Sequence, residues 1–143
     1  MARGRGIGRL AALALAFAFA VLLATGCGSS QTFTASEFVD RINAQGVSIE
    51  LGRQLPSGGN AEDLYAVRLP PLAGQPRGSD RGRGASGSLY VFDDTGGAGD
   101  QLDACRHSGG LLCFRAANIV VVFEGGSLET QRLAVAMKRL ASQ

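Results

Sequence analysis

Residues 111–123, LLCFRAANIVVVF, contain two strongly β-prone runs, 111–114 and 119–123. The four residues between the runs are few enough for a hairpin turn, in which Asn118 is expected to adopt a left-handed backbone conformation. Three successive valines in the second run indicate a strand that is covered on both faces. The stretch therefore predicts two paired strands, the second of them central in a sheet.

The sequence on both sides of this hairpin contains further predicted strands and helices. Residues 47–51 alternate apolar and polar side chains, as a half-buried strand does. The expected order is α-β-β-β-α-β-β-α, which predicts an α+β fold with a mainly antiparallel sheet of about five strands and three helices packed on it. The remaining predicted strands are 64–69 and 88–92, and the predicted helices are 33–46, 98–107 and 127–141.

The first predicted helix has a complete set of start and stop signals. Thr34 is a favourable N-cap, and Glu37 three residues later completes a capping box. Phe33 and Phe38 occupy the two positions of a hydrophobic staple. Gly46 suits the end of the helix because glycine adopts the left-handed conformation without strain.

Two segments are expected to be loops. Residues 52–63 are polar and contain one proline and three glycines. Residues 74–87, GQPRGSDRGRGASG, include five glycines and no large apolar side chain, so they are expected to be flexible. The three arginines of this loop resemble those of RG-rich RNA-binding segments, but a solvated loop is the favoured interpretation and a weak attraction to anionic lipid headgroups is the intermediate one. We expect no nucleic-acid partner.

The N-terminus has the pattern of a targeting segment. Arg3, Arg5 and Arg9 precede fifteen uninterrupted apolar residues, 10–24, and Thr25-Gly26 leads to Cys27. This pattern resembles the signal peptide and lipobox of bacterial lipoproteins. The resemblance implies that residues 1–26, a helical signal peptide, are cleaved and that Cys27 carries lipid. A signal peptide without lipid, an uncleaved anchor and a buried helix are the alternatives, although fifteen helical residues span only about 22 Å.

A lipoprotein signal implies how the chain is divided into segments and where the protein is located in the cell. Residues 27–32 would form a lipidated tether and residues 33–143 a single globular domain. The domain would sit on the extracytoplasmic face of the cell membrane, close to its surface. Sorting to an outer membrane stays open if the host has one, because Gly28 is not the aspartate that retains many lipoproteins in the inner membrane.

The charges and cysteines agree with this division. The chain has 14 Lys and Arg against 12 Asp and Glu, and three of the arginines belong to the signal segment. The remaining domain is nearly neutral, so its charge predicts no acidic partner. If Cys27 carries lipid, Cys105 and Cys113 remain as a pair in a compartment that permits disulfides.

Cys105, His107 and Cys113 allow three interpretations: a disulfide, free thiols or a metal site. A disulfide needs only the two thiols, and a nine-residue loop closed by the bridge stabilises a domain by roughly 2.5 kcal/mol. A structural zinc site needs four ligands, so Asp100 and Asp103 would have to join. We predict the disulfide, with Cys105 and Cys113 stapling a helix to the sheet, and we predict no metal and no cofactor.

Asp94-Thr95-Gly96 resembles the Asp-Thr-Gly turn of aspartic proteases, where two carboxylates share a proton. The chain departs from that family, because Asp93 stands where an apolar residue is expected and no second such tripeptide exists. The interpretation we favour is a strand-to-helix turn. His107, the single histidine, is expected at an exposed helix end.

Two classes of function are compatible with the sequence. The first is a non-enzymatic binding or structural module that is lipid-anchored in the cell envelope and meets an unknown envelope protein or small ligand. The second is an envelope hydrolase that uses Asp93, Asp94 or His107. The sequence favours the first class because no nucleophile–base pair is visible in it.

Overall fold

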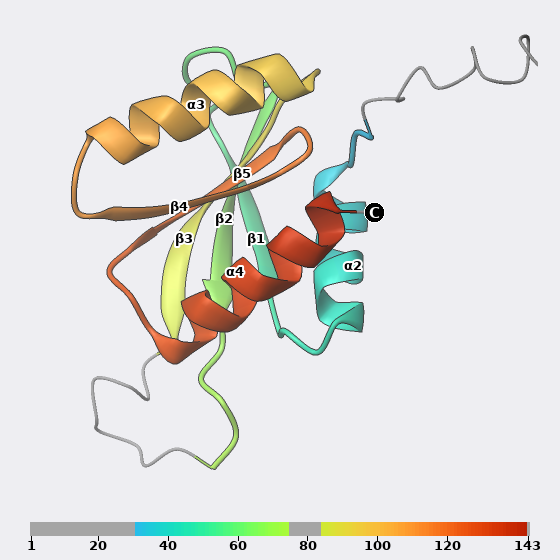
Figure 1. Ribbon diagram of the computed structural model, residues 1–143, viewed down its shortest axis with the longest axis vertical. Helices are drawn as coiled ribbons and strands as arrows, with labels where there is room; N and C mark the ends of the chain where they lie inside the picture. Colours follow the sequence, from blue (N-terminus) through green and yellow to red (C-terminus); the bar gives the residue numbers. More distant parts are fainter. Residues whose placement is uncertain (1–30, 75–83, 143) are drawn as a thin grey trace, which may run out of the picture.

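The computed structural model describes residues 31–74 and 84–142. Within these ranges the chain forms an α+β domain, in which a five-stranded antiparallel sheet carries three helices (Figure 1). The predicted fold class and order of elements are therefore confirmed. The predicted signal segment 1–26, the lipidation residue Cys27 and residues 75–83 of the predicted loop lie outside the described residues.

The strands follow the order β1-β2-β3-β5-β4, and each neighbouring pair is antiparallel. The last strand of the chain is therefore inserted between β3 and β4, and β1 and β4 form the two edges. The strands are β1 Glu50–Leu55, β2 Asp63–Leu69, β3 Ala85–Val91, β4 Leu111–Ala116 and β5 Ile119–Glu124, and the helices are α2 Ala35–Ala44, α3 Thr95–His107 and α4 Leu128–Ala141.

The helices lie on both faces of the sheet: α2 and α4 cover one face, and α3 covers the other (Figure 1). Ile119 and Val121 of β5 pack into the core beneath α2 and α4. Val120, between them, points the opposite way and packs with Ala98 of α3. Ile119, Val120 and Val121 are all fully buried, which confirms the prediction that this strand is covered on both faces.

The start of α2 follows its sequence signals. The Thr34 hydroxyl accepts a hydrogen bond from the Glu37 N–H, and the Glu37 carboxylate accepts one from the Thr34 N–H, as in a capping box. Phe33 and Phe38 are both buried. Gly46 has φ +80°, which fits its predicted role at the end of the helix.

The third and fourth helices begin at capped positions. The predicted start of α3 at residue 98 is three residues late, because the Asp94 side chain accepts a hydrogen bond from the Gly97 N–H at 2.9 Å and initiates the helix at Thr95. The glycines after Asp94 belong to this first turn. In α4, Ser127 is the N-cap rather than the first helical residue.

The first strand is shifted from its predicted position at 47–51. The Asn43 side chain accepts a hydrogen bond from the Ile49 N–H at 2.8 Å and donates one to the Ile49 carbonyl at 3.2 Å. These bonds occupy the backbone of Ile49, so pairing with β2 begins at Glu50 and continues to Leu55. The predicted loop 52–63 is therefore too long at both ends.

The third strand also starts earlier than predicted. Residues 85–87 were expected in the flexible loop, but they pair with β2, and Gly87 also lies opposite Phe123 of β5. A Cβ atom at Gly87 would collide with the Val122 carbonyl and the Phe123 ring. The glycine that suggested a loop thus permits a close approach between two strands.

The turn between β4 and β5 corrects a further prediction. Ala117, with φ 53°, takes the left-handed conformation that was expected for Asn118. Asn118 is buried, with 3% of its surface exposed, and its side chain forms hydrogen bonds elsewhere in the domain.

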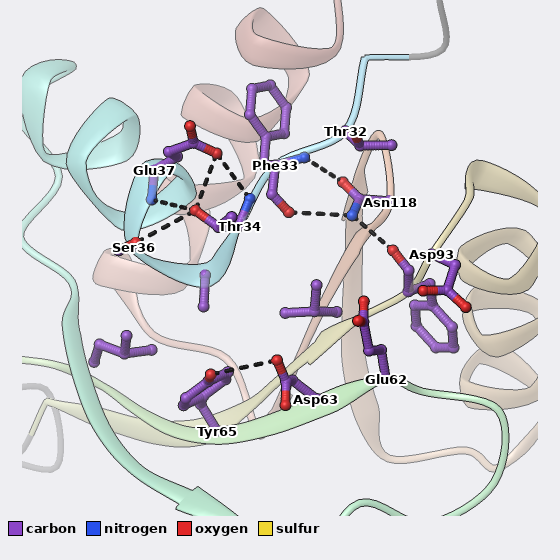
Figure 2. A pocket seen from close by; sticks show the side chains of 14 residues that line it. Thr32, Phe33, Thr34, Ser36, Glu37, Glu62, Asp63, Tyr65, Asp93 and Asn118 are labelled. Carbon is purple, nitrogen blue, oxygen red and sulfur yellow. Dashed lines mark hydrogen bonds between the residues drawn. The ribbon is translucent and has the colours of Figure 1, made fainter.

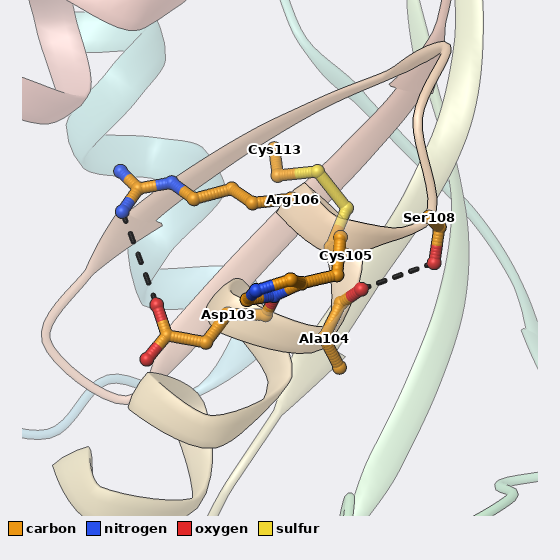
Figure 3. The surroundings of a disulfide bond; sticks show 7 residues. Asp103, Ala104, Cys105, Arg106, Ser108 and Cys113 are labelled. Atoms are coloured by element: carbon orange, nitrogen blue, oxygen red, sulfur yellow. Dashed lines mark hydrogen bonds and ion pairs between the residues drawn. A yellow bond between two sulfur atoms is a disulfide. The ribbon is translucent and has the colours of Figure 1, made fainter.

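Cys105 and Cys113 form a disulfide between the last turns of α3 and the edge strand β4 (Figure 3). Their Cα atoms are 6.2 Å apart, as the predicted staple requires. Leu112 and Phe114, the neighbours of Cys113 along the strand, pack against the core under α2 and α4. The bridge therefore fixes α3 to its own face of the sheet at the edge where strand pairing is one-sided.

Candidate functional site

A cleft of about 580 Å³ opens where β2 begins and β3 ends (Figure 2). One wall is the segment that leads into α2, and the other consists of the residues that flank these two strand ends. The cleft is lined by Thr32, Phe33, Thr34, Ala35, Ser36, Glu37, Leu51, Glu62, Asp63, Tyr65, Val91, Phe92, Asp93 and Asn118.

Asn118 joins the two walls of the cleft. Its side-chain oxygen accepts a hydrogen bond from the Phe33 N–H at 2.7 Å, and its amide nitrogen donates to the Phe33 carbonyl at 3.1 Å. The same nitrogen donates to the Phe92 carbonyl at 2.7 Å, while the Asn118 carbonyl accepts from the Phe92 N–H at 3.0 Å. One buried carboxamide thus holds the segment before α2 against the ends of β3 and β5.

The α2 wall presents polar groups that are already ordered. The Glu37 carboxylate accepts hydrogen bonds from the Thr34 N–H at 2.9 Å and from the Thr34 hydroxyl at 3.0 Å. These two bonds, with a smaller contribution from the charge of Arg41, hold the pKa of Glu37 below its ordinary value. Glu37 therefore remains a carboxylate at the mouth of the cleft at neutral pH.

The opposite wall contains a pair of carboxyl groups, Glu62 and Asp93 (Figure 2). A hydrogen bond between the two side chains and the negative charge of Asp93 raise the pKa of Glu62, and Asp63 adds a smaller effect of the same sign. Carboxyl pairs of this kind in a cleft mark candidate functional sites.

Tyr65 and Asp63 lie at the floor of the same cleft. The Tyr65 hydroxyl donates a long hydrogen bond of 3.5 Å to Asp63. Partial burial, followed by the negative charge of Asp63, raises the pKa of Tyr65, so its phenol stays protonated. The amide of Gln54 on β1 donates to the other oxygen of Asp63.

The arrangement provides hydrogen-bond acceptors and negative charge around an aromatic floor. It suits a ligand that carries hydrogen-bond donors or a positive charge. Within residues 31–74 and 84–142, no group of three or more His, Cys, Asp or Glu side chains is placed to hold a metal ion. The chemistry that the cleft offers from its own residues is therefore recognition by carboxylates, one of which, Glu62, has a raised pKa beside Asp93.

The structure separates the candidate residues of the sequence analysis. Asp93 lines the cleft, whereas the Asp94 side chain caps α3. His107 lies at the other end of that helix, about 18 Å along the axis, and its Nδ1 is 2.6 Å from the Asp103 carbonyl. Asp93 and His107 thus cannot act on one substrate atom, and the partner that the structure gives Asp93 is Glu62.

A smaller cavity of about 200 Å³ lies between the start of α4 and residues 70–73. Glu129, of which 3% is exposed, lies in the wall of this cavity and accepts a hydrogen bond from the Leu72 N–H at 3.3 Å. Burial disfavours the charged form, but hydrogen bonds from its own N–H, Ser127 and Leu72, together with the charge of Arg132, lower its pKa. Glu129 therefore fastens the segment after β2 to α4.

Comparisons with protein-family models, with curated proteins and with solved structures found no match to this chain. In the part of the chain that the structure describes, no helix is long and apolar enough to cross a membrane.

The Glu62–Asp93 pair predicts a substitution that stabilises the protein. The raised pKa means that the unfolded state releases the Glu62 proton first as the pH rises above about 4.5, so the folded state loses relative stability there. Glu62→Gln keeps a hydrogen-bond donor toward Asp93 and removes the repulsion. We expect the melting temperature to rise by on the order of a degree or two at pH 7 and to be unchanged at pH 4.

Thermal unfolding followed by circular dichroism at both pH values measures this difference. Glu124→Gln, which removes an exposed carboxylate at the end of β5, is the matched control. A melting temperature that falls at pH 7 in Glu62→Gln alone would show that the ionised Glu62 stabilises the fold.

Proposed function

We propose that this protein is a lipid-anchored protein of the bacterial cell envelope whose domain is a binding module. The N-terminal pattern from Arg3 to Cys27 supports the anchor and the extracytoplasmic address. The cleft beside the start of the described chain supports the binding role. In this arrangement the lipid attaches the domain to the membrane, and the cleft receives an envelope ligand or a segment of an envelope protein.

The observation that carries the binding role is the pair Glu62 and Asp93 in the cleft wall. Two neighbouring carboxyl groups repel each other when both are ionised, so the pair does not favour folding at neutral pH. Destabilising groups of this kind are characteristic of functional sites, where activity opposes stability. A bound positive charge would relieve the repulsion between Glu62 and Asp93 in the folded protein.

Glu37 and Asp63 extend the acidic surface across the cleft, and the ring of Tyr65 provides an apolar floor with a face that attracts cations. We infer that the ligand carries an ammonium group, as amino-bearing envelope polymers and lysine side chains do. The α2 wall is held in place by Asn118, so the site is formed before the ligand arrives.

An envelope hydrolase is the second candidate, because two neighbouring carboxyl groups, one of them with a raised pKa, can act as acid and base. The catalytic residues of such a hydrolase would be Asp93 and Glu62, because Asp94 is a helix cap and His107 lies at the other end of α3. The two functions differ in what substitution does: in a hydrolase, Asp93→Asn would stop turnover of a bound ligand, whereas in a binding module it weakens binding.

The anchor predicts that Cys27 is modified. Expressed with its full N-terminus in a bacterium, the wild-type protein should enter the detergent phase and show a diacylglyceryl adduct by intact mass, because two or three acyl chains give stable membrane attachment. Cys27→Ala should accumulate as an unlipidated precursor. The double variant Cys105→Ser/Cys113→Ser is the control and should keep the adduct. A wild-type mass without lipid would contradict the anchor.

The binding role predicts a charge-selective interaction in the cleft. In two-dimensional NMR spectra of the protein without residues 1–27, 1,5-diaminopentane should shift the amide signals of Glu62, Asp93 and Phe33, and the neutral 1,5-pentanediol should not. Glu62→Gln/Asp93→Asn should weaken the binding about tenfold, the effect of losing roughly 1.4 kcal/mol. Asp103→Asn, on the opposite face of the sheet, is the matched control. Equal shifts with the diol would contradict the proposal.

A further inference from the structure

The exposed face of α4 differs in charge from the rest of the domain. Its exposed charged residues, Arg132, Lys138 and Arg139, are all cationic, and its one acidic residue, Glu129, is buried. The remainder of the described chain carries ten acidic and five basic residues. The helix thus presents a positive surface on a domain that is otherwise negative.

The same face exposes two large apolar side chains. Leu128 is 49% exposed and Val135 is 53% exposed, and they are two of the three exposed large hydrophobic residues in the described ranges. Residues 128, 132, 135 and 139 follow a spacing of four, three and four, which aligns them along one side of a helix. Leu128, Arg132, Val135 and Arg139 therefore form one stripe, which we call the α4 stripe, and Lys138 flanks it.

The α4 stripe lies close to the point at which the chain would leave for the membrane. α2 packs against α4, and Figures 1 and 2 both show the segment before α2 beside the last turns of α4. Cys27 precedes Thr32 by five residues, and this segment reaches at most about 20 Å when fully extended. A lipid on Cys27 would therefore keep α4 within reach of the bilayer surface.

We propose that the α4 stripe lies on the membrane, with Arg139 and the flanking Lys138 on anionic phospholipid headgroups and Leu128 and Val135 at the boundary with the acyl chains. The Arg132 guanidinium donates a hydrogen bond to the Gly46 carbonyl at 3.2 Å and is not counted among these headgroup contacts. The inference rests on the proposed lipid anchor. Cations attract anionic headgroups, and each basic residue near such a surface changes the affinity about fivefold. Apolar side chains among basic residues are typical of helices that lie in the interface.

The lipid anchor allows even a weak contact between α4 and the membrane to keep the helix docked. Because the lipid already holds the domain at the surface, docking of α4 is an intramolecular step with a high effective concentration. A second copy of the chain is a poorer occupant, since the cations of two α4 stripes would face each other.

The experiment places an environment-sensitive NBD fluorophore at Val135→Cys in the full-length, lipidated protein. The protein is reconstituted into vesicles of phosphatidylcholine alone or with 30% phosphatidylglycerol, and quenching by the impermeant reductant dithionite is followed. We expect quenching to be slowed several-fold in the anionic vesicles. Lys138→Gln/Arg139→Gln should abolish the protection, whereas Arg53→Gln/Arg106→Gln, which removes two cations from β1 and α3, should retain it.

The outcomes separate this inference from the proposed function. A lipid adduct on Cys27 together with equal quenching in both vesicles overturns the membrane contact and leaves the anchor standing. Protection that depends on protein concentration and not on lipid charge identifies a second copy as the occupant and also overturns it. The absence of a lipid adduct contradicts the anchor, and the inference fails with it.

Discussion

The carboxamide of Asn118 joins the segment before α2 to the common end of β3 and β5. It is buried beside the turn between β4 and β5, and it bonds both backbone groups of Phe33 and the carbonyl of Phe92. Each of these backbone groups would cost about 1–3 kcal/mol if it were left buried and unpaired. A single side chain therefore sets where the chain enters the domain, and it closes β3 and β5 at their common end.

The position of Phe33 determines where α2 and the cleft are placed. Phe33 lies in the core beneath α2 and α4, and it precedes the capped start of α2 at Thr34. The entry point thus places α2 against α4 and defines one wall of the acidic cleft. On the far face, the Cys105–Cys113 bridge holds α3 to the edge strand, so each face of the sheet has its own constraint.

The sequence predicted the features that depend on local chemistry. Apolar periodicity located the elements, the capping box located α2, and cysteine parity predicted the disulfide, because each signal lies within a few residues or in the composition. The boundaries that it missed depend on distant atoms. Gly87 was predicted to lie in a loop because its pairing with Phe123 of β5 is not visible in the local sequence. The shifted start of β1 results from the hydrogen bonds between Asn43 and Ile49. Asn118 was expected to shape its own turn, whereas its partners are 85 and 26 residues away. For the same reason Glu62 could not be recognised as the partner of Asp93.

Hydrogen exchange at the Phe33 amide measures whether Asn118 fixes the point at which the chain enters the domain. In the wild type, this N–H is bonded to Asn118 in a buried site, so it should exchange only in openings that detach the segment before α2. In Asn118→Ala the Phe33 amide should exchange at close to the rate of an unstructured chain, while the core amides of β5 remain protected. Asn43→Ala, which removes the two hydrogen bonds to Ile49, should leave Phe33 protected. A Phe33 amide that exchanges equally in the wild type and in Asn118→Ala would show that Asn118 does not hold the segment before α2.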